Sequence, residues 1–182
     1  MGRLRRLECP AAGSSWAYRA LALGIYDLMT GYGGHGVGSR REARERAMAL
    51  LYEAEAKGCV PLGTVLDDLV VDPEAFAAEL VAGVSRHQDE IDELIGRFAR
   101  GWALARMPVV DRSLLRIGTY ELAHRPDIPL GAVICEAVEL AKAFSTDDSG
   151  RFVNGVLAKI ATELRSGEVP VAEGPPAATV GP

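Results

Sequence analysis

Residues 132–157 read AVICEAVELAKAFSTDDSGRFVNGVL, with two apolar halves on either side of a short polar segment. In its first half, apolar residues recur at the three- and four-residue spacing of a helix, at Val133, Ala137, Leu140, Ala141 and Phe144. The same spacing returns after the polar residues 145–148, at Phe152, Val153, Val156, Leu157 and Ile160. Short polar side chains at 145–148 can accept hydrogen bonds from the free backbone N–H groups of a helix start. We therefore predict two core helices that meet at a tight polar corner.

The chain before this corner reads as a series of helices. Ser39 is expected to cap the first of them, which runs to about Lys57 and ends at Gly58. The next predicted helices cover about 61–70, 72–98 (with a bend near Gly83 and Ser85) and 108–124. Apart from an ambiguous apolar patch at residues 69–71, no stretch shows the alternation of a β-strand bounded by hairpin turns. The sequence therefore predicts an all-α fold, a compact bundle of about seven helices.

Three blocks of sequence follow one another: RREAR at 40–44 with LY at 51–52, LRIGTYEL at 115–122, and EAVELAKAF, DS and FVNGVL within 136–157. In this order they resemble the NusB family of bacterial transcription antitermination factors. The resemblance covers about residues 39–165 and implies an all-helical RNA-binding domain. It also implies a function: with NusE, such a protein recognises single-stranded boxA in nascent ribosomal RNA and supports processive transcription as part of the transcription complex.

The rest of the chain is predicted to lie outside this domain. Residues 1–38 are expected to be an extension that is disordered or a marginal helix. Residues 166–182 contain several prolines and glycines and no periodic pattern, so a disordered tail is expected there.

The predicted RNA-binding residues come from the first helix, the central helix and the corner. Arginine forks match phosphate oxygens, and an aromatic ring can stack on an unpaired base. Carried over from the family by position, the predicted RNA-binding residues are Arg40, Arg41, Arg44, Tyr52, Arg116, Phe144, Asp148, Ser149, Arg151 and Phe152. Asp111 and Asp148 are the candidates for the NusE side. An ordinary solvated helix face with i,i+4 charge pairs is the alternative for the arginines of the first helix.

Two positions depart from the family pattern. Cys135 stands where the family often has Asn, and we expect it to pack as a small apolar residue. Gly150 replaces a commonly polar or basic residue, which removes one RNA contact.

Composition and scattered residues exclude several other functions. The net charge of −5 argues against a general nucleic-acid binder, and no apolar run is long enough to span a bilayer. The three cysteines and three histidines share no ligand-like spacing, so we expect no disulfide, metal site or cofactor, in a reduced cytoplasmic setting. Asp147 and Asp148 are adjacent on the chain and point apart, and Ser149 has no assigned base, so we expect no catalytic residue and no enzyme.

Other functions stay open at this point. A similar helical domain precedes the catalytic part of a ribosomal RNA cytosine methyltransferase, and a helical protein-interaction module without RNA is a second alternative. The sequence also leaves open a homodimer that hides the arginines of the first helix.

Overall fold

The computed structural model describes residues 39–99 and 101–165, so the predictions for 1–38 and 166–182 lie outside the described residues. Within these ranges the structure contains six α-helices and two 3-10 helices, and no β-strand. The elements are α3 (Arg40–Lys57), η1 (Leu62–Asp68), α4 (Ala75–Arg86), α5 (Gln88–Phe98), η2 (Leu104–Arg106), α6 (Val109–His124), α7 (Leu130–Phe144) and α8 (Ser149–Leu164). The predicted all-α fold is confirmed. No helix in the described part of the chain is both long enough and apolar enough to cross a membrane.

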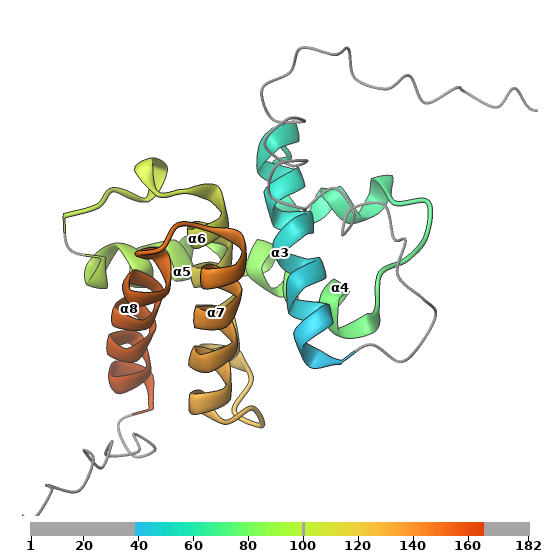
Figure 1. Cartoon of the computed structure of the whole chain (residues 1–182). Coiled ribbons are helices and arrows are strands. Elements are labelled where there is room, and N and C mark those ends of the chain that lie inside the picture. Colours follow the sequence, from blue (N-terminus) through green and yellow to red (C-terminus); the bar gives the residue numbers. More distant parts are fainter. Residues whose placement is uncertain (1–38, 100, 166–182) are drawn as a thin grey trace, which may run out of the picture.

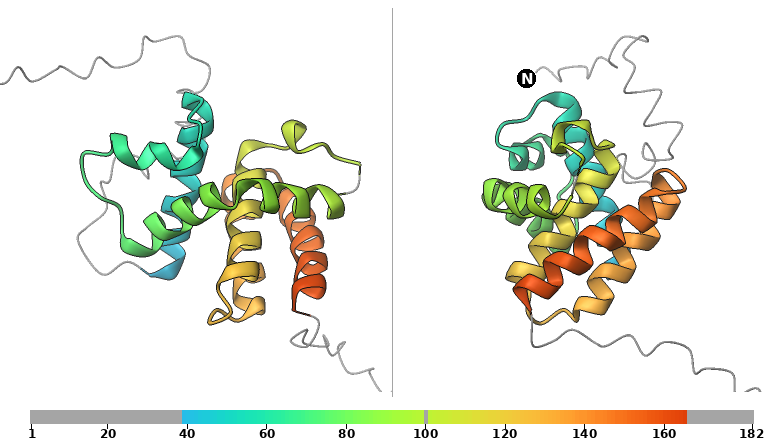
Figure 2. Two further views of the ribbon diagram at one scale, coloured as in Figure 1. Left: turned by 180° about the vertical axis from the view of Figure 1, so that it is seen from behind. Right: turned by 90° about the vertical axis from the view of Figure 1, so that its left-hand side faces the viewer.

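Helix α6 is the centre of the bundle. It packs against α3, α4 and α5, and also against the antiparallel pair α7 and α8. Figure 1 and the left view of Figure 2 show α3 and α4 on one side of α6, with α8 on the other. The core is continuous through these elements and includes fully buried Leu51, Leu80, Leu115 and Leu140. The polar corner, residues 145–148, lies at the end of this pair where α7 passes into α8.

Local sequence signals set both ends of α3. The Ser39 side chain accepts a hydrogen bond from the Glu42 backbone N–H, and the Glu42 carboxylate accepts one from the Ser39 backbone N–H. This capping box satisfies two N–H groups that the helix leaves unpaired. At the other end Gly58 adopts φ 70° and ψ 34°, the left-handed conformation that favours glycine. Both predicted ends are confirmed.

The buried face of α3 is wider than the sequence indicated. Helical spacing predicts a buried stripe of Ala43, Ala47, Leu50, Leu51 and Ala54 with Arg44, Met48 and Tyr52 at its edge, but all eight are buried. The reason is that α4, η1 and α6 all pack against this helix. An apolar stripe predicts that one face of a helix is buried. Helix α3 is buried over more than one face, because three other elements surround it.

The predicted helix over 72–98 is two helices. The break falls at His87 (φ −108°, ψ 21°) and not at Gly83 or Ser85. Gly83 has a different role, because a β-carbon there would overlap the ring of Tyr120. Gly83 therefore lets α6 pack closely against α4.

Candidate nucleic-acid interface

The α7–α8 corner is held by the hydroxyl group of Ser149. This hydroxyl donates a hydrogen bond to Asp111 Oδ2 (2.8 Å) and accepts one from the Thr146 backbone N–H (3.2 Å). Ser149 and Asp111 are both buried, at 2% and 1% exposed. The predicted capping by residues 145–148 is wrong, because the start of α8 has no side-chain capping hydrogen bond from its N-cap residue Asp148. The corner is instead fixed to the first turn of α6, which carries Asp111.

The outer side of the corner presents one arginine and a pair of aromatic rings. Arg151 is 89% exposed, and its ion-pair partner among the described residues is Asp148, itself 90% exposed, at 3.8 Å. The Phe152 ring packs edge-on against Trp102, with ring centroids 5.0 Å apart. Trp102 is 42% exposed, and Phe144 and Phe152 are half-buried. Such a group can contact a phosphate and offer a ring face to an unpaired base.

Trp102 is a candidate that the sequence analysis missed. It lies in the connection between α5 and α6, where no periodic pattern drew attention to it. The sequence does contain one indication of Trp102. A tryptophan in a segment without helical spacing is not explained by the packing of a helix into the core. The connection between α5 and α6 places this ring against Phe152 in the first turn of α8.

The start of α3 offers a second exposed basic group. Arg40 and Arg41 are both exposed. Arg41 pairs with Glu45 at 3.4 Å and reaches Glu136 of α7 at 3.9 Å. Both distances are long for an ion pair, and Arg41 is 44% exposed, so a phosphate can compete for its guanidinium.

Arg44 does not share this exposure. It is 4% exposed, and its guanidinium donates to both carboxylate oxygens of Glu121, at 2.7 to 3.2 Å. Its guanidinium also lies 5.6 Å from the centroid of the Phe76 ring, which Arg40 and Arg125 flank as well. Contact with RNA would require Arg44 to leave this buried ion pair.

Arg116 and Tyr52 are also inside the protein. Arg116 donates to Asp92 (2.7 Å) and Glu55 (2.5 Å), and Glu55 also pairs with Arg112. Burial disfavours the charged form of Arg116, but the hydrogen bonds and charges of Asp92 and Glu55 outweigh it and raise the pKa of the guanidinium. This network links α3, α5 and α6, which accounts for Arg116 without any ligand.

The structure separates the predicted residues into two groups. Six are exposed or half-buried: Arg40, Arg41, Phe144, Asp148, Arg151 and Phe152. Five are buried: Arg44, Tyr52, Asp111, Arg116 and Ser149. It does not bring Arg44 and Phe152 together, since Arg44 contacts Glu121 whereas Phe152 contacts Trp102.

The exposed groups are connected by the outer surface of α7. Arg41 contacts this helix at Glu136, and the eight residues from there to Phe144 correspond to about 12 Å of helix. Lys142 lies between them, 58% exposed and paired with Glu139 at 2.7 Å. A short single strand that follows α7 would pass from Arg41 to the corner.

Comparison with known proteins identifies the family. The family model described as the NusB family matches residues 41–162, which is most of the described chain. The chain belongs to the NusB family. The matched region contains every exposed residue of the candidate interface except Arg40.

Relatives of known function and solved structures agree with this assignment. The transcription antitermination protein NusB of Kineococcus radiotolerans is 46% identical over 126 residues, covering 68% of this chain and 93% of the relative. The structure of Thermotoga maritima NusB matches with a TM-score of 0.63 and 36% identity, over 69% of this chain and 92% of that chain. A NusB chain from a structure of the antitermination factors NusB and NusE in complex with double-stranded RNA matches with a TM-score of 0.57 and 31% identity, over 68% and 96% of the two chains.

Two further expectations concern single residues. Cys135 is exposed on α7, so the prediction that it packs as an apolar residue is wrong. Gly150 is buried, and a β-carbon there would lie 2.9 Å from Lys142 Cγ, so this position also allows Lys142 to lie over the corner.

Proposed function

We propose that this protein is an RNA-binding transcription antitermination factor that, together with NusE, recognises boxA in nascent ribosomal RNA and supports processive transcription. Membership of the NusB family supports the antitermination role. A family relative has been solved with NusE and double-stranded RNA, which supports the choice of partners.

The observation that carries the RNA-binding part is the exposed group at the corner. Arg151 is nearly fully solvated, and its sequence neighbour Phe152 packs edge-on against the exposed ring of Trp102. Phosphate contacts hold a strand in place without reading its sequence, and stacked bases gain about 1–3 kcal/mol each. Arg40 and Arg41 at the start of α3 then supply further phosphate contacts along α7.

Asp148 is the proposed contact to NusE. Its carboxylate is 90% exposed and points out from the corner, where a basic group of a partner can reach it. Asp111 has a different place in the proposal, because it is buried under Ser149 and contributes by holding the corner.

The test is a titration of labelled single-stranded boxA RNA with the full chain, at several salt concentrations, with and without NusE. We expect tighter binding to boxA than to a scrambled RNA of the same composition, and a further gain when NusE is present. Three arginine–phosphate contacts (Arg40, Arg41 and Arg151) predict a slope of log K against log salt of about −2. Equal binding to scrambled RNA with a slope near zero would favour the protein-interaction module instead.

A further inference from the structure

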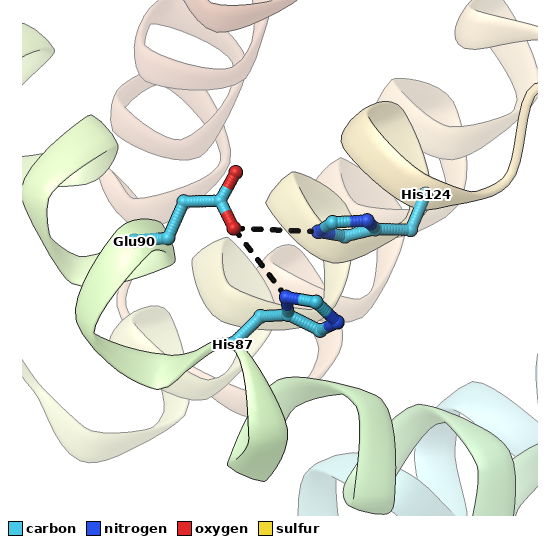
Figure 3. A group of neighbouring side chains, drawn as sticks. All are labelled: His87, Glu90 and His124. Carbon is cyan, nitrogen blue, oxygen red and sulfur yellow. Dashed lines mark ion pairs between the residues drawn. The ribbon is translucent and has the colours of Figure 1, made fainter.

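Two histidines that are distant in sequence meet a glutamate at the junction of α4, α5 and α6. His87 lies between α4 and α5, Glu90 one turn later in α5, and His124 is the last residue of α6. Figure 3 shows a single carboxylate oxygen facing both rings. Glu90 Oε2 is 3.4 Å from His87 Nδ1 and 3.8 Å from His124 Nε2. Each residue offers one ligand atom, and the three atoms lie within 4.8 Å of one another.

The protein alone does not satisfy this cluster. His124 Nε2 is buried and has no hydrogen-bond partner among the described residues. A buried polar atom without a partner costs about 1–3 kcal/mol. Burial and the neighbouring His87 lower the pKa of His124, which favours the neutral imidazole, the form that binds metals. The two imidazole rings also lie close together, with centroids 4.0 Å apart, without a hydrogen bond between them.

We propose that His87, Glu90 and His124 form a binding site for a divalent transition-metal ion, with zinc as the ion that this ligand set suits. Two imidazole nitrogens and one carboxylate oxygen are ligands that zinc accepts together, with an open fourth position. Tetrahedral bonds of about 2.0–2.1 Å place neighbouring ligand atoms about 3.3 Å apart. The His87–Glu90 pair already has this separation, and small side-chain rotations would bring His124 to it.

The cluster is open to solvent on one side. A depression of about 470 Å³, whose lining includes Arg86, His87, Asp89 and Glu90, borders two of the three proposed ligands, with His124 behind them. His87 is 32% and Glu90 58% exposed, so an ion can enter from this side. Three protein ligands leave one position for water or for a donor from a partner.

The proposal is independent of RNA binding, since its readout requires no RNA. Chelator-treated full-length protein is titrated with Zn²⁺ by calorimetry and with Co²⁺ by visible absorption. We expect one site per chain, a cobalt spectrum without thiolate charge transfer, and at least tenfold weaker binding in both Glu90→Gln and His124→Gln. Glu93→Gln is the matched control, because it removes an exposed carboxylate of α5 that is not part of the cluster.

A second measurement guards against misfolded variants. Glu90 is largely exposed, so Glu90→Gln is expected to melt at the wild-type temperature without metal. Zinc should raise the melting temperature of the wild type and not that of Glu90→Gln, because an ion stabilises only the state that binds it. Equal zinc affinity in wild type, Glu90→Gln and His124→Gln, or loss of binding only when a cysteine is replaced, would overturn the proposal.

Discussion

Arg44 of α3 and Glu121 of α6 form an ion pair in the interior, with exposures of 4% and 1%. The guanidinium donates to both carboxylate oxygens, which is the geometry that offsets the cost of burying two charges. The pair joins the first helix of the described chain to the central one. Arg44 is therefore part of the interior of the fold, and the exposed basic groups are its neighbours Arg40 and Arg41.

Removing one partner of this pair is expected to destabilise the protein strongly. Arg44→Met leaves the Glu121 carboxylate buried without its counter-charge, and such changes cost about 3–5 kcal/mol. Urea unfolding monitored by circular dichroism measures the free energy of unfolding. Arg41→Ala is the control, since its ion pairs are solvated and are expected to contribute at most about 1 kcal/mol. Similar small losses in both variants would show that the Arg44–Glu121 pair does not stabilise the fold.

The hydroxyl of Ser149 is expected to be necessary for the geometry of the corner. Ser149→Ala leaves Asp111 Oδ2 buried without its donor, at a cost of about 1–3 kcal/mol. Asp148→Ala changes an exposed neighbour and should leave stability within about 0.5 kcal/mol. Thermal melts of the two variants make the comparison. If Asp148→Ala proved the more destabilising, the corner would depend on a contact other than Ser149–Asp111.

Two helical glycines are expected to respond to alanine in opposite ways. Gly83→Ala forces a β-carbon into the Tyr120 ring and should cost about 1–3 kcal/mol. At Gly155 a β-carbon would meet nothing within 4 Å, so Gly155→Ala should stabilise α8 by up to about 1 kcal/mol. Chemical unfolding of both variants tests the pair. A stabilised Gly83→Ala protein would mean that Tyr120 moves aside at little cost.

The elements of the fold could be predicted where the signal is local. The capping box at Ser39, Gly58 after α3, and the apolar spacing of α7 and α8 each act within a few residues, so the sequence alone indicates them. The break between α4 and α5 falls at His87, where neither glycine nor proline marks it. Residues 61–70 form a 3-10 helix over Leu62–Asp68, which the same apolar pattern does not distinguish from an α-helix.

The candidate site was less predictable because it depends on distant partners. The burial of Arg44 follows from Glu121, 77 residues later, and no helical spacing encodes such a pairing. Trp102 reaches Phe152 from a connection without periodic pattern. His87 and His124 likewise come together only through the packing of α5 against α6. Residue types therefore indicated which side chains are able to bind RNA or a metal ion. Tertiary contacts determine which of these side chains are accessible to a ligand.

Acidification is expected to weaken the fold through His124. Burial and the neighbouring His87 lower the pKa of His124, and the opposite effect of Glu90 is smaller. Just below the ordinary histidine pKa of about 6.5, the unfolded chain therefore binds more protons than the folded one. Stability is then complete above that value and decreases as the pH falls through it. Urea unfolding in chelator at about pH 7.5 and about pH 5.5 measures the loss, which should be smaller in His124→Gln. Identical losses in both proteins would assign the pH dependence to other groups.

Two corner variants are expected to separate phosphate contact from base stacking. Arg151→Ala should weaken binding to boxA and scrambled RNA alike and make the salt slope shallower by about 0.7, because one phosphate contact is lost. Trp102→Ala should reduce boxA affinity by about 1–3 kcal/mol, if its ring stacks on a base, with little change in the salt slope. Lys159→Ala is the matched control, since it removes an exposed charge farther along α8. Fluorescence anisotropy at several salt concentrations gives affinity and slope together, with a thermal melt to confirm that Trp102→Ala is folded. Wild-type affinity in both corner variants would place the RNA elsewhere on the protein.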